Sequence, residues 1–254
     1  MENAQSDEKE NGEKPDHPFT QLRGSDIRGD NSIFYNIPGE PSMVVRKSFV
    51  NVSDGEAEEM DIHEKAEYLR NKAVEFKKII DRLGIRTAKT DYIIGTDPEK
   101  DRPAIFGVTE RIDGENLEET PFLDRETAEK VDDLYAKIII ESIDSYLKNG
   151  PYWHDPKNAQ FVFGKAQGDE KPDIYLVDVD PNVHTWDEWE KLKEPQEFST
   201  KPESIFWDHM KWILMEMEDL ENKVDEKNFK LVKAREALER AKTAVPGAAE
   251  KGIK

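Results

Sequence analysis

Apolar residues recur along this chain at two different periods, and the period assigns most of the expected elements. Over residues 57–83 they return at spacings of three and four, which predicts a long amphipathic helix ended by Gly84. A second such helix is predicted over residues 125–147, before Gly150 and Pro151 stop it. The side chains expected to be buried by these two helices are Ala66, Leu69, Ala73, Phe76, Ile80, Leu83, Val131, Leu134, Ile138, Ile139, Ile143 and Leu147.

Short apolar runs bounded by Gly and Pro predict strands in the first half of the chain. Residues 22–52 contain several such runs, including Ser32–Tyr35 and Met43–Val45. The runs 92–95 and 104–108 predict two further strands around a charged, exposed loop at 97–102. The segment that follows, 110–114, is interpreted as a crossover to the second half.

The last third of the chain is predicted to be helical. An aromatic helix is expected over residues 204–220, and its Trp and Met residues fall at helical spacing, which is typical of core packing. A charged helix is expected at about 226–242. The order of elements predicts an α+β fold with two lobes. The first, at 19–112, holds strands and one long helix, and the second, at 113–243, is mainly helical.

Both ends of the chain are expected to stay outside the core. Residues 1–18 are almost entirely polar and charged, so ordering them would cost entropy without compensating apolar contacts. We therefore predict a disordered acidic tail at 1–18 and a flexible tail at 244–254.

Composition and charge exclude several classes of protein. Charged residues make up 37% of the 254 residues, the formal net charge is -19, and the chain has no long Lys/Arg run, so nucleic acid is not an expected partner. The absence of cysteine excludes disulfides and thiolate chemistry. No run approaches the ~18 apolar residues of a membrane span, and no signal pattern opens the chain. A soluble, cytoplasmic protein is expected.

Two acidic segments beside apolar runs carry the candidate chemistry. Asp155 lies just before the run Phe161–Phe163, and Asp178 comes just after the run Ile174–Val177. Because carboxylates at strand ends can meet in one cleft, two such acids can divide the roles of general base and metal ligand. For Asp178 and the neighbouring Asp180, the alternative is a turn in which both side chains cap local backbone.

The order of these two segments resembles the catalytic loop and the metal loop of the protein-kinase-like fold. This resemblance implies ATP and Mg²⁺ as cofactors, with Asp155 as the base that accepts a hydroxyl proton and Asp178 as a Mg²⁺ ligand. In the family an asparagine five residues after the aspartate binds the second metal. Gln160 occupies that position, and nearby Asn158 is an alternative ligand.

The resemblance also assigns a phosphate-binding group to the first lobe. Lys47, at the end of an apolar strand, matches the lysine that binds the nucleotide phosphates, and a carboxylate of the next helix would hold it. Glu67 is the predicted ion-pair partner of Lys47, and Glu64 is the alternative. Gly24 and Gly29 flank a segment that either brings backbone close to phosphates or forms a plain turn.

Departures from the family pattern leave the function open between two classes. His154 directly precedes Asp155, which differs from regulated protein kinases, and no Ala-Pro-Glu signature follows Asp178. We predict a phosphotransferase that acts on a hydroxyl of a small molecule or a protein. The alternative is a pseudokinase, a catalytically inactive member that uses the fold for binding. A third interpretation is an acidic helical adaptor whose C-terminal helices pair with another chain.

Overall fold

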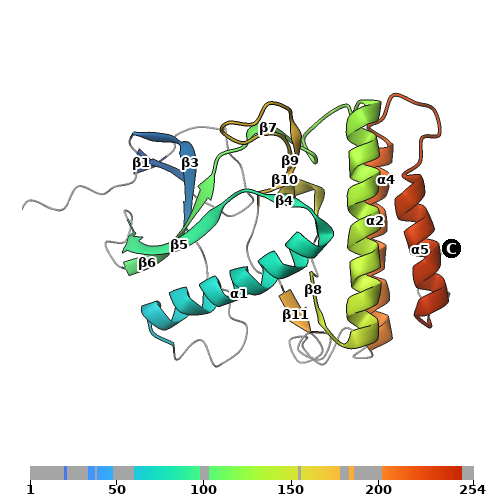
Figure 1. Ribbon diagram of the computed structural model, residues 1–254, viewed down its shortest axis with the longest axis horizontal. Coiled ribbons are helices and arrows are strands. Elements are labelled where there is room, and N and C mark those ends of the chain that lie inside the picture. The colour runs from blue at the N-terminus through green and yellow to red at the C-terminus, as the bar shows by residue number, and fades with distance from the viewer. Residues whose placement is uncertain are drawn as a thin grey trace, which may run out of the picture.

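The computed structural model describes residues 20–21, 34–37, 39–47, 60–97, 103–153, 156–177, 183–185 and 202–247. Within these ranges the chain forms an α+β fold, as the sequence predicts (Figure 1). The helices are α1 (Ile62–Leu83), α2 (Arg125–Lys148), α4 (Pro202–Glu221), α5 (Val232–Ala244) and the short 3-10 helix η1 (Asn158–Gln160).

The described strands form one larger sheet and two smaller ones. The first has the order β1-β2-β3-β6-β5, the second β4-β10-β9-β7, and the third pairs β11 with β8. Among the described strands, β4 pairs with β10 in parallel and the other pairs are antiparallel. The strands are β1 (Thr20–Gln21), β2 (Phe34–Ile37), β3 (Glu40–Lys47), β4 (Arg86–Thr87), β5 (Thr90–Thr96), β6 (Pro103–Glu110), β7 (Asp113–Asn116), β8 (Pro151–Trp153), β9 (Phe161–Lys165), β10 (Asp173–Leu176) and β11 (Val183–Thr185).

Helix α1 begins and ends with defined caps. The Asp61 side chain accepts hydrogen bonds from the backbone N–H groups of His63 and Glu64, and the Glu64 carboxylate accepts one from the Asp61 N–H. This capping box satisfies donors that the first turn leaves free, so the helix begins at 62 and not at 57 as predicted. At the other end, Gly84 has φ 63°, a left-handed conformation that glycine adopts without a steric penalty.

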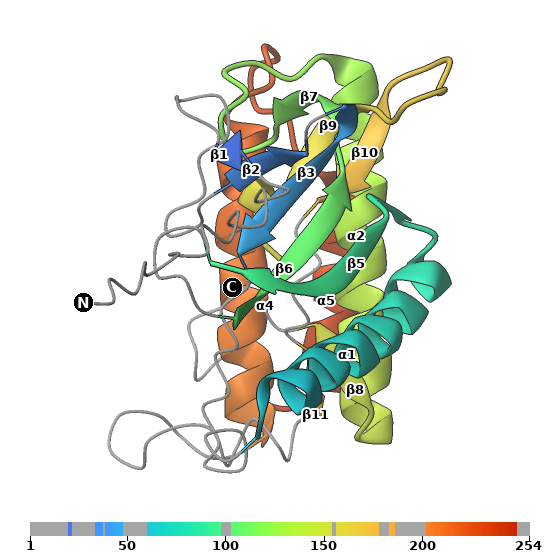
Figure 2. The ribbon, with the colours of Figure 1, turned by 90° about the vertical axis from the view of Figure 1, so that its left-hand side faces the viewer.

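The two halves of α1 pack against different parts of the molecule. Near its start, Ala66 and Leu69 form a small core with Tyr92 of β5 and Ile105 of β6. Near its end, Phe76 and Ile80 belong to the main core with the helices and the second sheet. Figure 2 shows α1 crossing beneath the first sheet and reaching α2 and β8. The helix therefore connects the first sheet to the helical side of the protein.

Helices α2, α4 and α5 lie side by side and contribute most of the main core (Figure 1). The aromatic helix predicted at 204–220 is confirmed as α4. The predicted burial of Leu147 is wrong, since its side chain is 60% exposed. Tyr146 takes the inward position in the last turn of α2, where its ring lies 5.2 Å from that of Phe206.

The charged helix begins later than predicted. Residue Asn228 has φ 65°, which is not helical, and α5 starts only at Val232. Its first N–H groups are bound by carboxylates of other elements, because Glu221 accepts from the Leu231 N–H and Asp132 accepts from the N–H of Ala234. Leu238 of α5 is buried in the main core of its own chain.

The predicted crossover at 110–114 is a strand connection. Strand β6 continues to Glu110, and β7 then pairs with β9. Gly114 lies opposite Gly164 in this pair, and a Cβ added at Gly114 would come within 2.2 Å of the Phe163 carbonyl oxygen. Side chains at these two positions would push the strands apart, so the glycines allow β9 to sit where it does.

The expected tail at 1–18 lies outside the described residues. The first residues of the C-terminal tail expected at 244–254 instead belong to the fold, since Ala244 ends α5, Val245 is buried in the main core and the Pro246 carbonyl oxygen accepts a hydrogen bond from Trp207 Nε1. Residues 248–254 lie outside the described residues. Among the helices that the structure describes, none is both long and apolar enough to cross a membrane.

Candidate functional site

Strand pairing brings together the chain segments that flank the two acidic segments. Leu176, near the end of β10, pairs with Phe161 at the start of β9, and the Val177 N–H donates to the Gln160 carbonyl oxygen at 2.9 Å. On the other side, Trp153 at the end of β8 pairs with Val183 at the start of β11. The strands that lead into or out of these segments thus form two pairs in separate sheets, and the rings of Trp153 and Phe161, 5.7 Å apart, join one pair to the other.

Four of the predicted site residues lie outside the described residues, namely Asp155, Asp178, Gly24 and Gly29. Lys47 is the last residue of β3, and its backbone pairs with that of Phe106 in β6. Its side chain lies outside the described part of the structure.

The two glutamates proposed as partners of Lys47 are both at the start of α1. Glu67 is exposed and has no ion pair or hydrogen bond among the described residues. The Glu64 carboxylate accepts a hydrogen bond from the Asp61 N–H in the capping box. The pairing of either glutamate with Lys47 therefore stays a prediction.

Gln160 is buried at the end of η1, next to the start of β9. Its Oε1 accepts from the Lys157 N–H at 3.4 Å, which is long for a hydrogen bond. Its own backbone N–H donates to the Lys157 carbonyl oxygen at 3.0 Å. The side-chain amide therefore folds back on its own turn, and a metal ion would have to compete with one weak bond for its oxygen.

Asn158 is the best-anchored polar residue of this loop, and the sequence did not predict its role. The Tyr135 hydroxyl donates to its Oδ1 at 2.7 Å, and its Nδ2 donates to the Glu216 carbonyl oxygen at 3.0 Å. The Glu216 carboxylate in turn accepts from the Asn158 N–H at 2.7 Å. With 1% of its surface exposed and both ends of its amide hydrogen-bonded, Asn158 anchors this loop.

Burial is the main cause of the pKa shifts in this network. It raises the pKa of Glu216, and the neighbouring Glu118 and Asp219 carboxylates add to the rise, which the Asn158 N–H and Lys157 partly offset. Burial also raises the pKa of the Tyr135 hydroxyl well above its usual value, so it remains a donor to Asn158. The loop 156–160 is thus fastened to both α2 and α4 through hydrogen bonds.

Aromatic packing supports the same loop from the other side. The Trp153 ring lies 5.7 Å from that of Phe161 and 5.4 Å from that of Phe76, both in edge-to-face geometry. Because Phe76 belongs to α1, the base of the loop also contacts the helix that carries Glu67.

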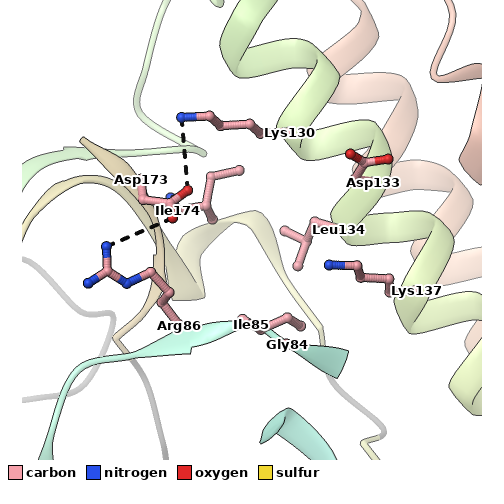
Figure 3. Close-up of a pocket in the computed structure, with 9 residues that line it drawn as sticks. All are labelled: Gly84, Ile85, Arg86, Lys130, Asp133, Leu134, Lys137, Asp173 and Ile174. Atoms are coloured by element: carbon pink, nitrogen blue, oxygen red, sulfur yellow. Dashed lines mark hydrogen bonds and ion pairs between the residues drawn. The ribbon is translucent and has the colours of Figure 1, made fainter. Parts of the chain in front are cut away.

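A separate hollow of about 200 Å³ lies between the end of α1, β4, β10 and α2 (Figure 3). Of the predicted site residues whose side chains the structure describes, neither Glu67 nor Gln160 lines it. Its lining combines apolar and charged side chains from those four elements, namely Gly84, Ile85, Arg86, Lys130, Asp133, Leu134, Lys137, Asp173 and Ile174. Among the described residues, no group of His, Asp and Glu side chains has the geometry of a metal site.

Comparison with known proteins adds no family to these findings. The chain matches none of the protein-family models against which it was scanned, and it has no significant match among curated proteins.

Tyr135, which the predicted buried set of α2 does not include, is a sequence signal for the Asn158 network. Tyr135 falls between Leu134 and Ile138 on a face expected to be buried, and a buried hydroxyl requires a hydrogen-bond partner. That reasoning indicates a polar partner but does not identify it, because the partner comes from a loop far along the chain.

Proposed function

We propose that this chain is a kinase-like phosphotransferase with a two-lobe fold, which uses ATP and Mg²⁺ to phosphorylate a hydroxyl of a small molecule or a protein. The observation that carries the proposal is the pairing of β9 with β10 and of β8 with β11, joined by the contact of Trp153 with Phe161, because these four strands lead into or out of the segments that contain Asp155 and Asp178. A base and a metal ligand of phosphoryl transfer must lie near one another, and these pairings favour that arrangement.

The first sheet and α1 support the same proposal. Strand β3, which ends at Lys47, lies beside β6 in the sheet, and α1 follows β3 in the chain and packs on β5 and β6. This is the order expected for a strand that supplies a phosphate-binding lysine and a helix that supplies its carboxylate partner, Glu67.

In the proposed reaction each group has one role. The acceptor hydroxyl oxygen attacks the γ-phosphorus as the bond to ADP breaks, and Asp155 accepts the hydroxyl proton. Asp178 and Gln160 would hold Mg²⁺, which would neutralise charge on the phosphates, and Lys47 would add a positive charge there. The backbone at Gly24 and Gly29 would bind the nucleotide phosphates.

A thermal-shift measurement with ATP, with and without Mg²⁺, tests the proposal. At about 100 times the Kd, binding raises Tm by roughly 5–10 °C for a chain of this size. We expect this shift to require Mg²⁺, to disappear in Asp178→Ala and to persist in Asp144→Ala, a matched change at a surface carboxylate of α2 paired with Lys148. An unchanged Tm in the wild-type protein with Mg²⁺ and ATP would contradict the proposal.

The second candidate is an inactive member of the same fold that binds a protein partner or nucleotide without catalysis. It is favoured by the position of the Gln160 amide, which is turned toward the Lys157 N–H. Phosphate transfer from ATP distinguishes the two. A phosphotransferase loses turnover in Asp155→Ala while it retains the Mg²⁺-dependent shift, whereas an inactive member shows no turnover in either protein.

A further inference from the structure

The hollow in Figure 3 has an apolar side formed by three residues. Leu134 of α2 and Ile174 of β10 are buried, and Ile85 is half-buried against the main core. Pockets for drug-sized ligands usually measure ~300–1,000 Å³, so a hollow of about 200 Å³ suits a smaller molecule.

Most charges of the lining are already neutralised by protein partners. Arg86 donates to Asp169 at 3.0 Å, and Asp133 pairs with Lys233 at 2.6 Å. Lys130 lies 3.9 Å from the Asp173 carboxylate (Figure 3) and 3.6 Å from that of Glu126 on its own helix.

Lys137 is the exception. It has no ion pair or hydrogen bond among the described residues. In Figure 3 its side chain extends from α2 toward Gly84 and Ile85. Its Nζ lies 4.0 Å from the point that a Cβ on Gly84 would occupy, and the residue is exposed, so the ammonium is accessible next to the end of α1.

We propose that this hollow binds a small monocarboxylate with an apolar body. The carboxylate pairs with the Lys137 ammonium, and the hydrocarbon part covers Ile85, Leu134 and Ile174. One uncompensated cation matches one negative charge, and the apolar side excludes a ligand that is charged throughout. This inference does not depend on the proposed phosphotransferase activity.

Such a ligand would contact both the segment that follows α1 and helix α2. Ile85 follows α1 directly, and α2 belongs to the helical layer. Between these two helices the structure has an ion pair of Arg82 with Glu141. A molecule bound beside that ion pair would hold the end of α1 against α2, and so would affect the helix that carries Glu67.

Benzoate is a suitable probe, with benzamide as its neutral counterpart. In a titration of the full chain followed by amide NMR shifts, we expect benzoate to move the Gly84 and Ile85 signals saturably. Lys137→Gln should weaken this binding by about tenfold, because one charge-assisted bond is lost. Lys211→Gln removes an exposed lysine from α4 and should leave it unchanged.

Three further results decide the inference. Benzamide should bind the wild-type protein about as weakly as benzoate binds Lys137→Gln, and Lys137→Arg should retain benzoate binding. If benzoate leaves the Gly84 and Ile85 signals in place, or if Lys137→Gln binds it as tightly as the wild-type protein, the inference is wrong. A matching thermal unfolding curve for Lys137→Gln shows that the variant is folded.

Discussion

At the scale of single residues, Asn158 shows how a small polar side chain fixes a loop in an otherwise apolar region. Its amide and backbone make bonds to α2 through Tyr135 and to α4 through Glu216. A buried polar group without a partner costs more free energy than a formed hydrogen bond contributes, so each member of this network depends on the others.

Removal of Asn158 tests that dependence. We expect Asn158→Ala to lower the free energy of unfolding by about 2–3 kcal/mol and Tyr135→Phe by about 1 kcal/mol. The loss in the double variant should be about 1 kcal/mol smaller than the sum of the two single losses. The reason is that each single variant leaves the other residue's polar group without its partner, whereas the double variant removes both groups. Chemical denaturation measures all three.

Asn222→Ala serves as the control for this cycle. Asn222 is exposed just after α4, and its N–H donates to the Glu218 carbonyl oxygen, which the substitution preserves. It should change the free energy of unfolding by less than about 0.5 kcal/mol. Strict additivity of Asn158→Ala and Tyr135→Phe would show that the two side chains are not coupled.

At the scale of elements, the start of α5 is held by carboxylates from other helices. Glu221, at the end of α4, is 4% exposed and accepts two hydrogen bonds from the Arg235 guanidinium at 2.7 and 2.6 Å. It also accepts from Lys230 and from the Leu231 N–H. Burial by itself would raise the Glu221 pKa, but these bonds outweigh it and the pKa is lowered.

The lowered pKa fixes the sign of a pH effect. Because the folded state holds Glu221 ionised more strongly than the unfolded state does, its stabilisation is present above the usual glutamate pKa of about 4.3 and is lost as pH falls below it. Glu221→Gln should therefore reduce the free energy of unfolding by about 3 kcal/mol at neutral pH. The difference in the free energy of unfolding between Glu221→Gln and the wild-type protein should become smaller at acidic pH.

Urea denaturation at several pH values measures this difference. Glu236→Gln is the matched control, since Glu236 is exposed on α5 and has no ion pair among the described residues. A Glu221→Gln deficit that stayed constant from neutral to acidic pH would argue against an ionised Glu221 as the source of the stabilisation.

At the scale of the whole molecule, the apolar core is divided unequally. The main core joins α2, α4, α5, the second sheet and the end of α1. The first sheet has two small clusters of buried residues, one with Val45 and Phe106, the other with Ala66, Leu69, Tyr92 and Ile105. Since opening free energies follow the amount of buried apolar contact, the first sheet should open more easily than the helical layer.

Native-state hydrogen exchange measures this difference. We expect amides of β3, β5 and β6 to exchange through openings of lower free energy than amides of α2 and α4. Val45→Ala should lower protection in the first sheet alone, whereas Leu238→Ala, in the main core, should lower it throughout. Equal protection in the two regions would mean that the protein opens as one unit.

The sequence by itself determined the secondary structure of most described elements. The periodic apolar positions of α1, α2 and α4 were enough, because a helix buries one face whatever it packs against. Prediction from the sequence was wrong where contacts with other elements fix the end of a helix or strand. One case is α5, whose start depends on hydrogen bonds to Asp132 and Glu221 of other helices. The β7 strand was missed because only its pairing with β9 defines it.

Tertiary structure decided what surrounds the candidate site. The sequence indicated two acidic segments, but only the pairing of β8 with β11 and of β9 with β10 brings their flanks together. Likewise, no local pattern connects Tyr135 to Asn158, or places Lys137 beside Gly84 with no ion pair to another residue of the described ranges. Local periodicity reports which face of an element is buried, while contacts between distant segments depend on how all elements pack at once.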